Sequence, residues 1–291
     1  MPGWPADASL GTLVVLAELN STLSSRSTDV KSGYWQDMTT SDFADVDPES
    51  SIALLPVAAV EQHGPHLPLG TDAMIVNAAS RALLDRVPPG VTLLVLPALE
   101  IGHSPEHESF AGTLSADAST LLDLWTEVGR RVAAAGVRKL IVLNAHGGQK
   151  SLVDLVAVRL RREQRMLVVR ASTFSFGVPP GLFDARERMN GLHGGDLETS
   201  LMLYLRPDLV RKDALADFGG LPERLAADNE VLGVEKPIGF GWMSEDLSPA
   251  GVTGNAAAAT ADKGRACFEH IVAQLAKLVA EVAAAPLSML K

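Results

Sequence analysis

Carboxylates and imidazoles gather in three short, glycine-containing segments of the sequence. The first segment runs from Glu61 to Asp72 and reads EQHGPHLPLGTD. The second, Asn144 to Gly148, reads NAHGG, and the third, His193 to Thr199, reads HGGDLET. Carboxylate oxygens and imidazole nitrogens are ligands of divalent transition metals, and glycine lets a backbone approach an ion closely. Together the three segments predict a metal-dependent hydrolase.

The first segment directly follows the apolar run Ile52 to Val60. Glu61 and His63 stand at the end of a predicted buried strand, and a Gly-Pro turn follows them, so they have little structural purpose and we interpret both as metal ligands. Asp72 precedes a helical pattern, where it could instead cap the helix and contribute about 1 kcal/mol. His66 could be a ligand, a hydrogen-bonding support for a ligand, or an exposed side chain, and we expect the supporting role.

The second and third segments offer further ligands. His146 precedes two glycines that would allow a tight turn from strand to helix, and Asn144 could orient it through a hydrogen bond. His193 and Glu198 lie five residues apart, too far for one face of a helix but suited to a loop and the helix that it opens. We therefore expect two distinct roles. Glu198 has a structural alternative, since the helix dipole stabilises a carboxylate in a first helical turn.

A fourth group of candidates, Gly102 to Glu108, contains two histidines four residues apart. Pro105 interrupts a continuous helix there, so we predict a loop at the edge of the site, with His107 supporting the ligands. Cys267 falls in an Ala-rich helical pattern and is expected to be a buried, inert thiol. No serine lies in a G-x-S-x-G context, and no phosphate-binding glycine motif follows a strand, so neither a serine nucleophile nor nucleotide binding is supported.

The chain has 291 residues, of which 47% are hydrophobic, enough for a sizeable buried core. Its 25 basic and 35 acidic residues give a formal net charge of -10, which disfavours nucleic acid and anionic membranes as partners. A single cysteine excludes an intramolecular disulfide and disfavours a thiolate metal cluster. No apolar run reaches the roughly 18 residues of a membrane span, and the first residues lack a basic leader, so we expect a cytoplasmic protein.

The candidate residues must be positioned by the elements between them. Residues 1–32 are rich in Ser and Thr without periodicity and predict a mobile N-terminal extension, followed by a single domain over residues 33–291. Short apolar runs predict strands at 52–60, 91–96, 140–144 and 166–171. Helical patterns predict helices at 74–86, 118–135, 150–163, 197–205 and 256–284. Residues 172–192 and the segment from 206 to about 255 are expected to be irregular, as lids often are.

Strands and helices that alternate in this way predict βαβ units and a mainly parallel sheet with helices on both faces, a three-layer α/β fold. Ligands of such sheets lie beyond the carboxyl ends of the strands. Glu61 and His63 follow the first predicted strand, and His146 follows the third by two residues. The predicted fold therefore places these candidate ligands at the edge where binding sites form.

The three segments, in their order along the chain, resemble the motifs of the creatininase (creatinine amidohydrolase) family. Residues 103–115, HSPEHESFAGTLS, also look like that family's loop between the second strand and the next helix. The resemblance covers about residues 34–205 and is expected to extend to the C-terminus. It implies the family's α/β fold and a homo-oligomer, commonly a hexamer.

The resemblance also implies a site for two divalent ions, which would be zinc, manganese or iron. The implied ligands are one bridging carboxylate and two side chains for each ion: Asp72 as the bridge, Glu61 with His146, and His63 with Glu198. A water held between the ions would be the nucleophile. His193 would pass a proton to the leaving nitrogen, and Glu198 would join it as a catalytic residue through its ion.

The implied substrate is a small molecule with a non-peptide C–N bond, a cyclic amide or a formamide. Creatinine is expected to be a poor substrate, because members that act on it can carry Glu at the position of Gly148 and place Trp near the substrate ring. Residues 172–192 contain Phe174, Phe176 and Phe183 but no Trp. Other members mature peptides or cleave a C–C bond of a keto-inositol ring. A non-catalytic metal-binding protein is a further alternative, although such a protein would not need His193 beside its metals.

Overall fold

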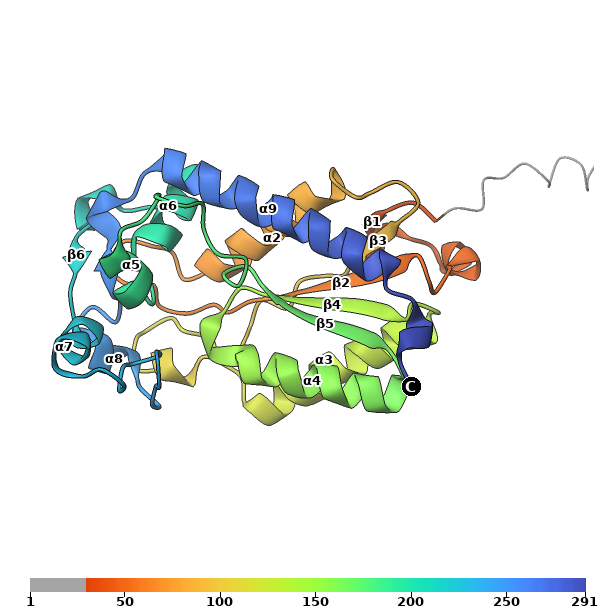
Figure 1. Cartoon of the computed structure of the whole chain (residues 1–291), viewed down its shortest axis with the longest axis horizontal. Helices are drawn as coiled ribbons and strands as arrows, with labels where there is room; N and C mark the ends of the chain where they lie inside the picture. The colour runs from red at the N-terminus through yellow and green to blue at the C-terminus, as the bar shows by residue number, and fades with distance from the viewer. Residues whose placement is uncertain (1–29) are drawn as a thin grey trace, which may run out of the picture.

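The computed structural model describes residues 30–291 (Figure 1). The predicted mobile extension, residues 1–32, lies outside this range except for its last three residues. These three residues lie along the edge of the sheet. The Thr92 hydroxyl donates to the Val30 carbonyl at 2.8 Å, and the Leu93 N–H donates to the Ser32 hydroxyl at 2.9 Å. The chain is therefore held against the sheet from residue 30, slightly earlier than the predicted start of the domain.

Five parallel strands form the central sheet, in the order β1-β3-β2-β4-β5. They are β1 (Gly33–Tyr34), β2 (Ser51–Val57), β3 (Thr92–Val95), β4 (Lys139–Asn144) and β5 (Leu167–Ser172). The apolar runs predict four of them, whereas the two residues of β1 are too few to show a pattern. Because β3 lies on one side of β2 and β4 on the other, the chain changes its direction across the sheet at β2.

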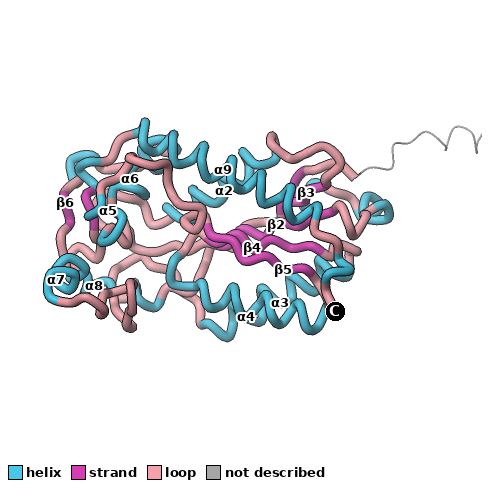
Figure 2. Tube along the Cα trace, in the orientation of Figure 1, coloured by secondary structure: helices cyan, strands magenta, loops and turns pink. Residues whose placement is uncertain are grey.

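Helices cover both faces of this sheet (Figures 1 and 2). One face carries α2 (Thr71–Leu84), α6 (Asp196–Leu205) and α9 (Ala261–Ala284), and the other carries α3 (Ala118–Ala134) and α4 (Lys150–Gln164). The predicted three-layer, mainly parallel α/β fold is confirmed. The end of the molecule beyond the sheet contains α5 (Ala185–Asn190), α7 (Leu221–Asp228), α8 (Ser244–Leu247) and a small antiparallel sheet of β6 (Asp217–Phe218) and β7 (Gly254–Asn255).

Side chains of the central strand β2 alternate between two hydrophobic clusters. Ile52 and Leu54 pack on the side of α2, α6 and α9. Ala53, Leu55 and Val57 pack on the side of α3 and α4. Because helices cover both faces, the strand is apolar at consecutive positions and not only at alternate ones. This explains why β2 is visible in the sequence as a continuous apolar run.

Pro56 lies inside this central strand, where its missing N–H would normally leave a gap in the hydrogen-bond ladder. Its carbonyl accepts the Leu99 N–H at 3.0 Å on the β3 side, and in a parallel strand the nitrogen of a residue faces the same side as its carbonyl. The register of β2 with β3 ends at the pair Leu54 and Val95. The missing N–H would thus point beyond the end of β3, where the ladder has already ended.

The C-terminal helix α9 packs along α6. Gly264 permits the close approach, because a Cβ at this position would overlap the carbonyl oxygen of Ser200. Lys263 pairs with the buried Asp196 at the start of α6. The Thr260 N–H donates to the Ser200 hydroxyl at 3.1 Å. These contacts fix the position of α6, whose first turn carries Glu198.

Some predicted boundaries differ from the structure. The final helix begins at Ala261 and not at 256, because Ala256–Ala258 forms a 3-10 turn and the Thr260 side chain caps the helix. The segment predicted to be irregular from 206 to about 255 contains α7 and α8, and residues 172–192 contain α5. These helices are too short for a hydrophobic period to be visible in the sequence.

None of the helices in residues 30–291 combines the length and the apolar character needed to cross a membrane. The longest, α9, carries charged side chains along its length.

Candidate metal centre

The three chemistry-bearing segments meet beyond the carboxyl ends of β2 and β4. Glu61 and His63 follow β2, and His146 follows β4 after one intervening residue. Loops diverge where the chain changes direction across a parallel sheet, and the crevice between them is where such folds bind ligands. The first turn of α2 adds Asp72, and the first turn of α6 adds Glu198. The fold thus brings all five predicted ligands to one edge of the sheet.

Asp72 lies at the centre of this group, with only 1% of its surface exposed. Its Oδ1 lies 3.4 Å from His63 Nε2, and its Oδ2 lies 3.5 Å from His146 Nδ1. The two oxygens of one carboxylate therefore face two different imidazoles. The alternative reading of Asp72 as a helix cap is wrong, because α2 already begins at Thr71 and Gly70 is the cap residue.

The hydrogen bonding of His63 leaves one ring nitrogen free for a metal. Its Nδ1 lies 3.1 Å from the carbonyl oxygen of Glu61, which can only accept, so in the neutral ring Nδ1 carries the proton and Nε2 presents a lone pair. His63 Nε2 and Asp72 Oδ2 are buried and lack a hydrogen-bond partner among the residues that the structure describes. Each such atom costs about 1–3 kcal/mol. A divalent cation would satisfy both, so these residues fit the predicted metal.

Glu61 and His146 form the second set around Asp72. His146 Nδ1 lies 3.1 Å from Glu61 Oε2, and the Ser104 hydroxyl donates to the same oxygen at 2.5 Å. Asn144 acts on the backbone of His146: its amide donates to the His146 carbonyl at 2.6 Å and accepts the His146 N–H at 3.0 Å. Asn144 therefore fixes the turn that carries the imidazole and does not orient the ring directly.

His193 and Glu198 approach from the side of α6. His193 Nε2 donates to the Gln62 carbonyl at 2.6 Å, which leaves Nδ1 of the neutral ring facing Glu61 Oε1 at 3.8 Å. Glu198 is half-buried, and its Oε2 accepts a backbone N–H at 2.6 Å. Ligand atoms of His63, His193 and Glu198 lie within 4.8 Å of one another. This geometry allows His193 to bind a metal or to stand beside it, so its role as a proton carrier stays a prediction.

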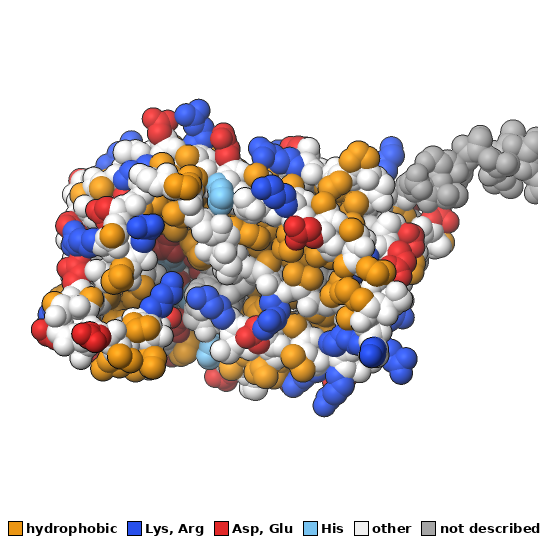
Figure 3. Space-filling model, viewed as in Figure 1, with side chains coloured by type: hydrophobic (Ala, Val, Ile, Leu, Met, Phe, Trp, Pro, Cys, Tyr) orange, Lys and Arg blue, Asp and Glu red, His pale blue; other side chains and the backbone are white. Residues whose placement is uncertain are grey.

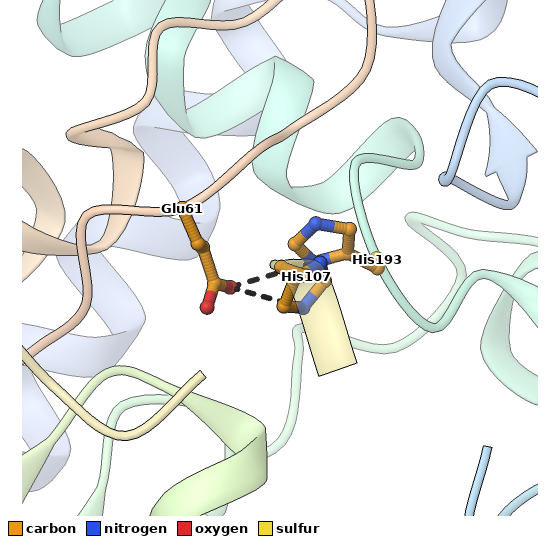
Figure 4. A group of neighbouring side chains, drawn as sticks. All are labelled: Glu61, His107 and His193. Atoms are coloured by element: carbon orange, nitrogen blue, oxygen red, sulfur yellow. Dashed lines mark ion pairs between the residues drawn. The ribbon is translucent and has the colours of Figure 1, made fainter. Parts of the chain in front are cut away.

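His107 stands beside His193 and points toward Glu61 (Figure 4). Gln62 Oε1 accepts the Gly64 N–H at 2.9 Å, so Gln62 Nε2 is the donor to His107 Nδ1 at 2.8 Å. The neutral His107 ring then carries its proton on Nε2, which faces Glu61 Oε1 at 3.5 Å. This arrangement suits the supporting role that the sequence predicts, although Glu61, His107 and His193 also lie within 4.8 Å of one another.

His66 lies away from the predicted ligands. It is fully buried, and its Nε2 lies 3.0 Å from the Gly194 carbonyl and 2.9 Å from the Thr199 hydroxyl. Its ring stacks on Phe218 at 5.2 Å. His66 therefore ties the first segment to the third and holds the turn that carries His193. We expected His66 to support a ligand side chain, but it contacts the backbone of the loop before α6 and the Thr199 hydroxyl.

Histidines are the ion-pair partners of Glu61 and Asp72 within residues 30–291. Burial alone would lower the pKa of His63, but the 3.4 Å contact with Asp72 and the charge of that carboxylate raise it to about 9. Burial likewise opposes a proton on His146, yet the charge of Glu61 and the contact with Asp72 raise its pKa well above the usual value. Burial would raise the pKa of Asp72, but the contacts with the His146 and His63 rings and their charges lower it to about 2. In the absence of a metal, protons on the imidazoles thus balance the carboxylates, and a bound cation would replace them.

A cavity of about 260 Å³ opens over these side chains. Besides predicted ligands, its walls include two aromatic rings and three cations: Phe174, Trp242, Lys150, Arg188 and Lys236. Trp242 comes from the segment between α7 and α8, and its ring meets His107 edge-on at 6.4 Å. Phe176 and Phe183 belong to the hydrophobic core. The cavity therefore contains a tryptophan, Trp242, although residues 172–192 have none. The sequence patterns did not identify Trp242.

A second cavity of about 660 Å³ adjoins the first. The two share Arg188, Leu192, Glu235 and Lys236. The remaining walls of the second cavity, which we call the apolar groove, are mostly hydrophobic and include Met189, Pro222, Leu232, Val234 and Pro237. Apolar side chains also gather on the surface at the α7 and α8 end of the molecule (Figure 3).

Two further candidates from the sequence do not join the ligand cluster. Cys267 is buried, and burial raises the pKa of its thiol to about 12, which agrees with the inert thiol predicted. The His103 side chain stabilises the loop that carries it, because its Nδ1 lies 3.0 Å from the Ala116 carbonyl.

Several known proteins are similar to this chain. A family model described as creatinine amidohydrolase matches residues 36–279. A mycofactocin precursor peptide peptidase of Mycobacterium ulcerans (strain Agy99) is 35% identical over 244 residues, which are 81% of this chain and 88% of the relative. A creatinine amidohydrolase of Pseudomonas putida is 32% identical over 182 residues, 57% of this chain and 68% of the relative. A solved structure of a creatininase variant of "Zn-Zn type" is 27% identical, with a TM-score of 0.71 over 86% of this chain and 98% of that one.

Proposed function

The chain belongs to the creatininase (creatinine amidohydrolase) family, and from this membership we propose that it hydrolyses an amide C–N bond at a site for two divalent metal ions. The observation that carries the proposal is the position of Asp72, whose two buried oxygens face different imidazoles. Each side adds one further carboxylate, Glu61 beside His146 and Glu198 near His63. A shared carboxylate with an imidazole and a carboxylate on either side suits a pair of divalent ions.

The proposed ions are zinc, manganese or iron, since each proposed ligand atom is an imidazole nitrogen or a carboxylate oxygen. Such a pair, when bound, would lower the pKa of a coordinated water and would polarise the amide oxygen of the substrate. The protein contributes orientation. The Glu61 carbonyl holds the ring of His63, and the Ser104 hydroxyl and the His107 Nε2–H are aimed at the Glu61 carboxylate. These contacts limit the rotation of two ligands before any metal binds.

His193 is the residue that we propose moves the proton. Burial, followed by the charge of His63, lowers the pKa of His193 and so favours the neutral ring. The Gln62 carbonyl engages its Nε2–H, which leaves Nδ1 as the atom that takes a proton at the site and passes it to the leaving nitrogen. A metal-storage protein has no use for such a group, and this favours catalysis over storage.

A cyclic amide or a formamide is the proposed substrate class. The cavity of about 260 Å³ lies below the range typical of sites for drug-sized ligands and therefore suits a small molecule. Creatinine itself remains an expected poor substrate. Because Trp242 supplies an aromatic wall, that expectation now rests on Gly148, which offers no carboxylate.

The apolar groove favours a second candidate, a short peptide. The groove opens from the cavity over the metal centre, and Arg188 and Lys236 lie where the two meet. A peptide could place its scissile amide at the metals, an apolar side chain in the groove and a carboxylate beside these cations. The Mycobacterium ulcerans relative is a peptidase by name, which supports this candidate.

Metal analysis followed by a substrate panel tests the proposal. After loading with zinc, manganese or iron in separate samples, we expect elemental analysis to find about two ions per chain. The loaded protein is then assayed with creatinine, lactams, formamides and short peptides that end in apolar residues. One ion or none at saturation would contradict the two-metal site. Hydrolysis of the peptides without turnover of any small amide would select the second candidate.

We also propose that the chain forms a homo-oligomer, up to the hexamer that the family resemblance implies. Exposed apolar side chains between α7 and α8, among them Val231, Ile238 and Phe240, are candidates for subunit contact. Size-exclusion chromatography with light scattering measures the mass, and a species of 30.7 kDa at every concentration would contradict this proposal.

A further inference from the structure

Glu106 contacts the ring nitrogen of His146 that does not face the proposed metal ligands Glu61 and Asp72. It belongs to the 3-10 turn Pro105–His107, and its side chain is only 14% exposed. Glu106 Oε1 lies 3.3 Å from His146 Nε2. The other ring nitrogen, Nδ1, faces Glu61 at 3.1 Å and Asp72 at 3.5 Å. Glu106 and the proposed ligands Glu61 and Asp72 therefore face different nitrogens of the same imidazole.

The other groups around His146 Nε2 also act as acceptors. The His103 carbonyl lies 3.1 Å away and the Ser104 hydroxyl oxygen 3.3 Å away. The hydrogen of Ser104 is directed at Glu61 Oε2, so its oxygen can only accept from the ring. Together with Glu106, these groups favour the tautomer that carries its proton on Nε2 and its lone pair on Nδ1.

The space that Glu106 occupies exists because residue 148 is glycine. A Cβ at Gly148 would overlap Glu106 Oε1 and would lie 2.6 Å from His146 Nε2. Gly148 is not among the residues with positive φ, so backbone conformation does not require glycine there. A side chain at position 148 would thus force the Glu106 carboxylate out of its present position.

We propose that Glu106 is a positioning residue for the metal centre. It accepts a hydrogen bond from the His146 Nε2–H and leaves the lone pair of Nδ1 free for the ion that His146 and Glu61 would hold. Gly148 is part of the same arrangement, because it leaves room for the carboxylate. The inference rests on the metal site of the proposed function. A carboxylate behind a histidine ligand fixes the tautomer and raises the basicity of the ring, and its loss typically weakens metal binding about 10–100-fold.

Zinc affinity, measured by competition with a chelator of known affinity, tests the role of Glu106. We expect Glu106→Ala to bind one of the two ions about 10–100-fold more weakly. Glu106→Gln keeps an acceptor oxygen and should recover part of this loss. Glu108→Ala removes an exposed carboxylate from the same loop and should bind zinc like the wild type.

A double-mutant cycle links Glu106 to Gly148. Gly148→Ala should weaken zinc binding, because its Cβ displaces the carboxylate. The same substitution should cost less in a chain that already carries Glu106→Ala. Equal costs in the two backgrounds would overturn the proposed link between the two positions.

A second measurement does not depend on the metal. In metal-free protein with nitrogen-15-labelled histidine, the proton on His146 Nε2 should exchange faster with water in Glu106→Ala than in the wild type or in Glu108→Ala. Unchanged exchange, or wild-type zinc affinity in Glu106→Ala, would overturn the inference. Failure of the wild type to bind zinc would instead refute the proposed metal site, while the exchange measurement would still decide whether Glu106 holds the ring.

Discussion

Asp72→Asn removes the charge that the two proposed ions share and keeps the size of the side chain. Asp72 is 1% exposed, and its oxygens lie 3.4 Å from His63 Nε2 and 3.5 Å from His146 Nδ1. The substitution turns one of these oxygens into an NH₂ group, which donates hydrogen bonds and cannot bind a cation. The ion on that side loses a ligand, and the ion on the other side loses much of the negative charge that holds it.

The size of the effect follows from the distances. At an effective dielectric constant of about 20, two unit charges about 4 Å apart interact by about 4 kcal/mol. The two oxygens of Asp72 lie at comparable distances from the groups that they face. Metal binding should therefore weaken by several kcal/mol, roughly 10²- to 10³-fold at about 1.4 kcal/mol per decade. We expect kcat/KM of protein at limiting metal to fall by at least the same factor.

The assay combines equilibrium metal affinity, metal content and kcat/KM with the best amide of the substrate panel. Asp85→Asn is the matched control, since Asp85 is exposed at the other end of the same helix. Thermal unfolding of the metal-free proteins shows whether each variant is folded. If Asp72→Asn holds two ions with wild-type affinity and activity, Asp72 is only a buried acid that the dipole of α2 stabilises, and the bridging role is refuted.

Four further predictions follow from the site. His193→Ala should lower kcat about 10²- to 10⁴-fold and leave both ions in place; loss of an ion would identify His193 as a ligand. Zinc binding should release protons and strengthen as the pH rises to about 9, because zinc must displace protons from His63 and from His146, whose pKa values are raised in the metal-free protein; equal apparent enthalpies in buffers of different ionisation enthalpy would contradict this. Removal of metal with a chelator should lower Tm, since the ions bind only the folded chain, and an unchanged Tm would argue against a resident metal. Creatinine should be hydrolysed slowly because Gly148 offers no carboxylate, and efficient turnover in a coupled assay would overturn this expectation.

The residues at the strand ends could be predicted because their chemistry and their topology agree. Glu61 and His63 follow a run of apolar residues that only a strand buried on both faces explains, and His146 follows a second such run. Parallel strands end at the same edge of the sheet, so these side chains had to lie near one another. Their types then indicate a metal, since they have no packing role at that position.

The start of α2 shows why the role of Asp72 could not be decided from the sequence. A helix that began two residues later, at Ala73, would have made Asp72 its cap. Hydrogen bonds within the first segment set the start instead. The Thr71 hydroxyl donates to the Pro68 carbonyl at 2.7 Å, and the Glu61 N–H donates to the Leu69 carbonyl at 3.0 Å. These bonds fold the end of the first segment back onto its beginning and place Asp72 inside the helix.

Contacts between residues that are far apart in the sequence could also not be predicted from local sequence patterns. Glu106 meets His146, and Trp242 meets His107, although each pair is far apart in the sequence. Neither Glu106 nor Trp242 belongs to a helix or strand with a visible hydrophobic period. His66 shows the same limit, because its spacing from the ligands could not reveal that it contacts the loop before α6.

The packing of α9 on α6 bears on the order in which the site can form during synthesis. Domains emerge from the ribosome N-terminus first, and α9 follows α6 in the sequence. Glu61 and His146 lie on segments that leave the ribosome well before it. The helix that carries Glu198 lacks its packing partner until Gly264 can lie against Ser200. A nascent chain can therefore assemble the Glu61 half of the centre early, whereas the Glu198 half has to wait until α9 has been synthesised.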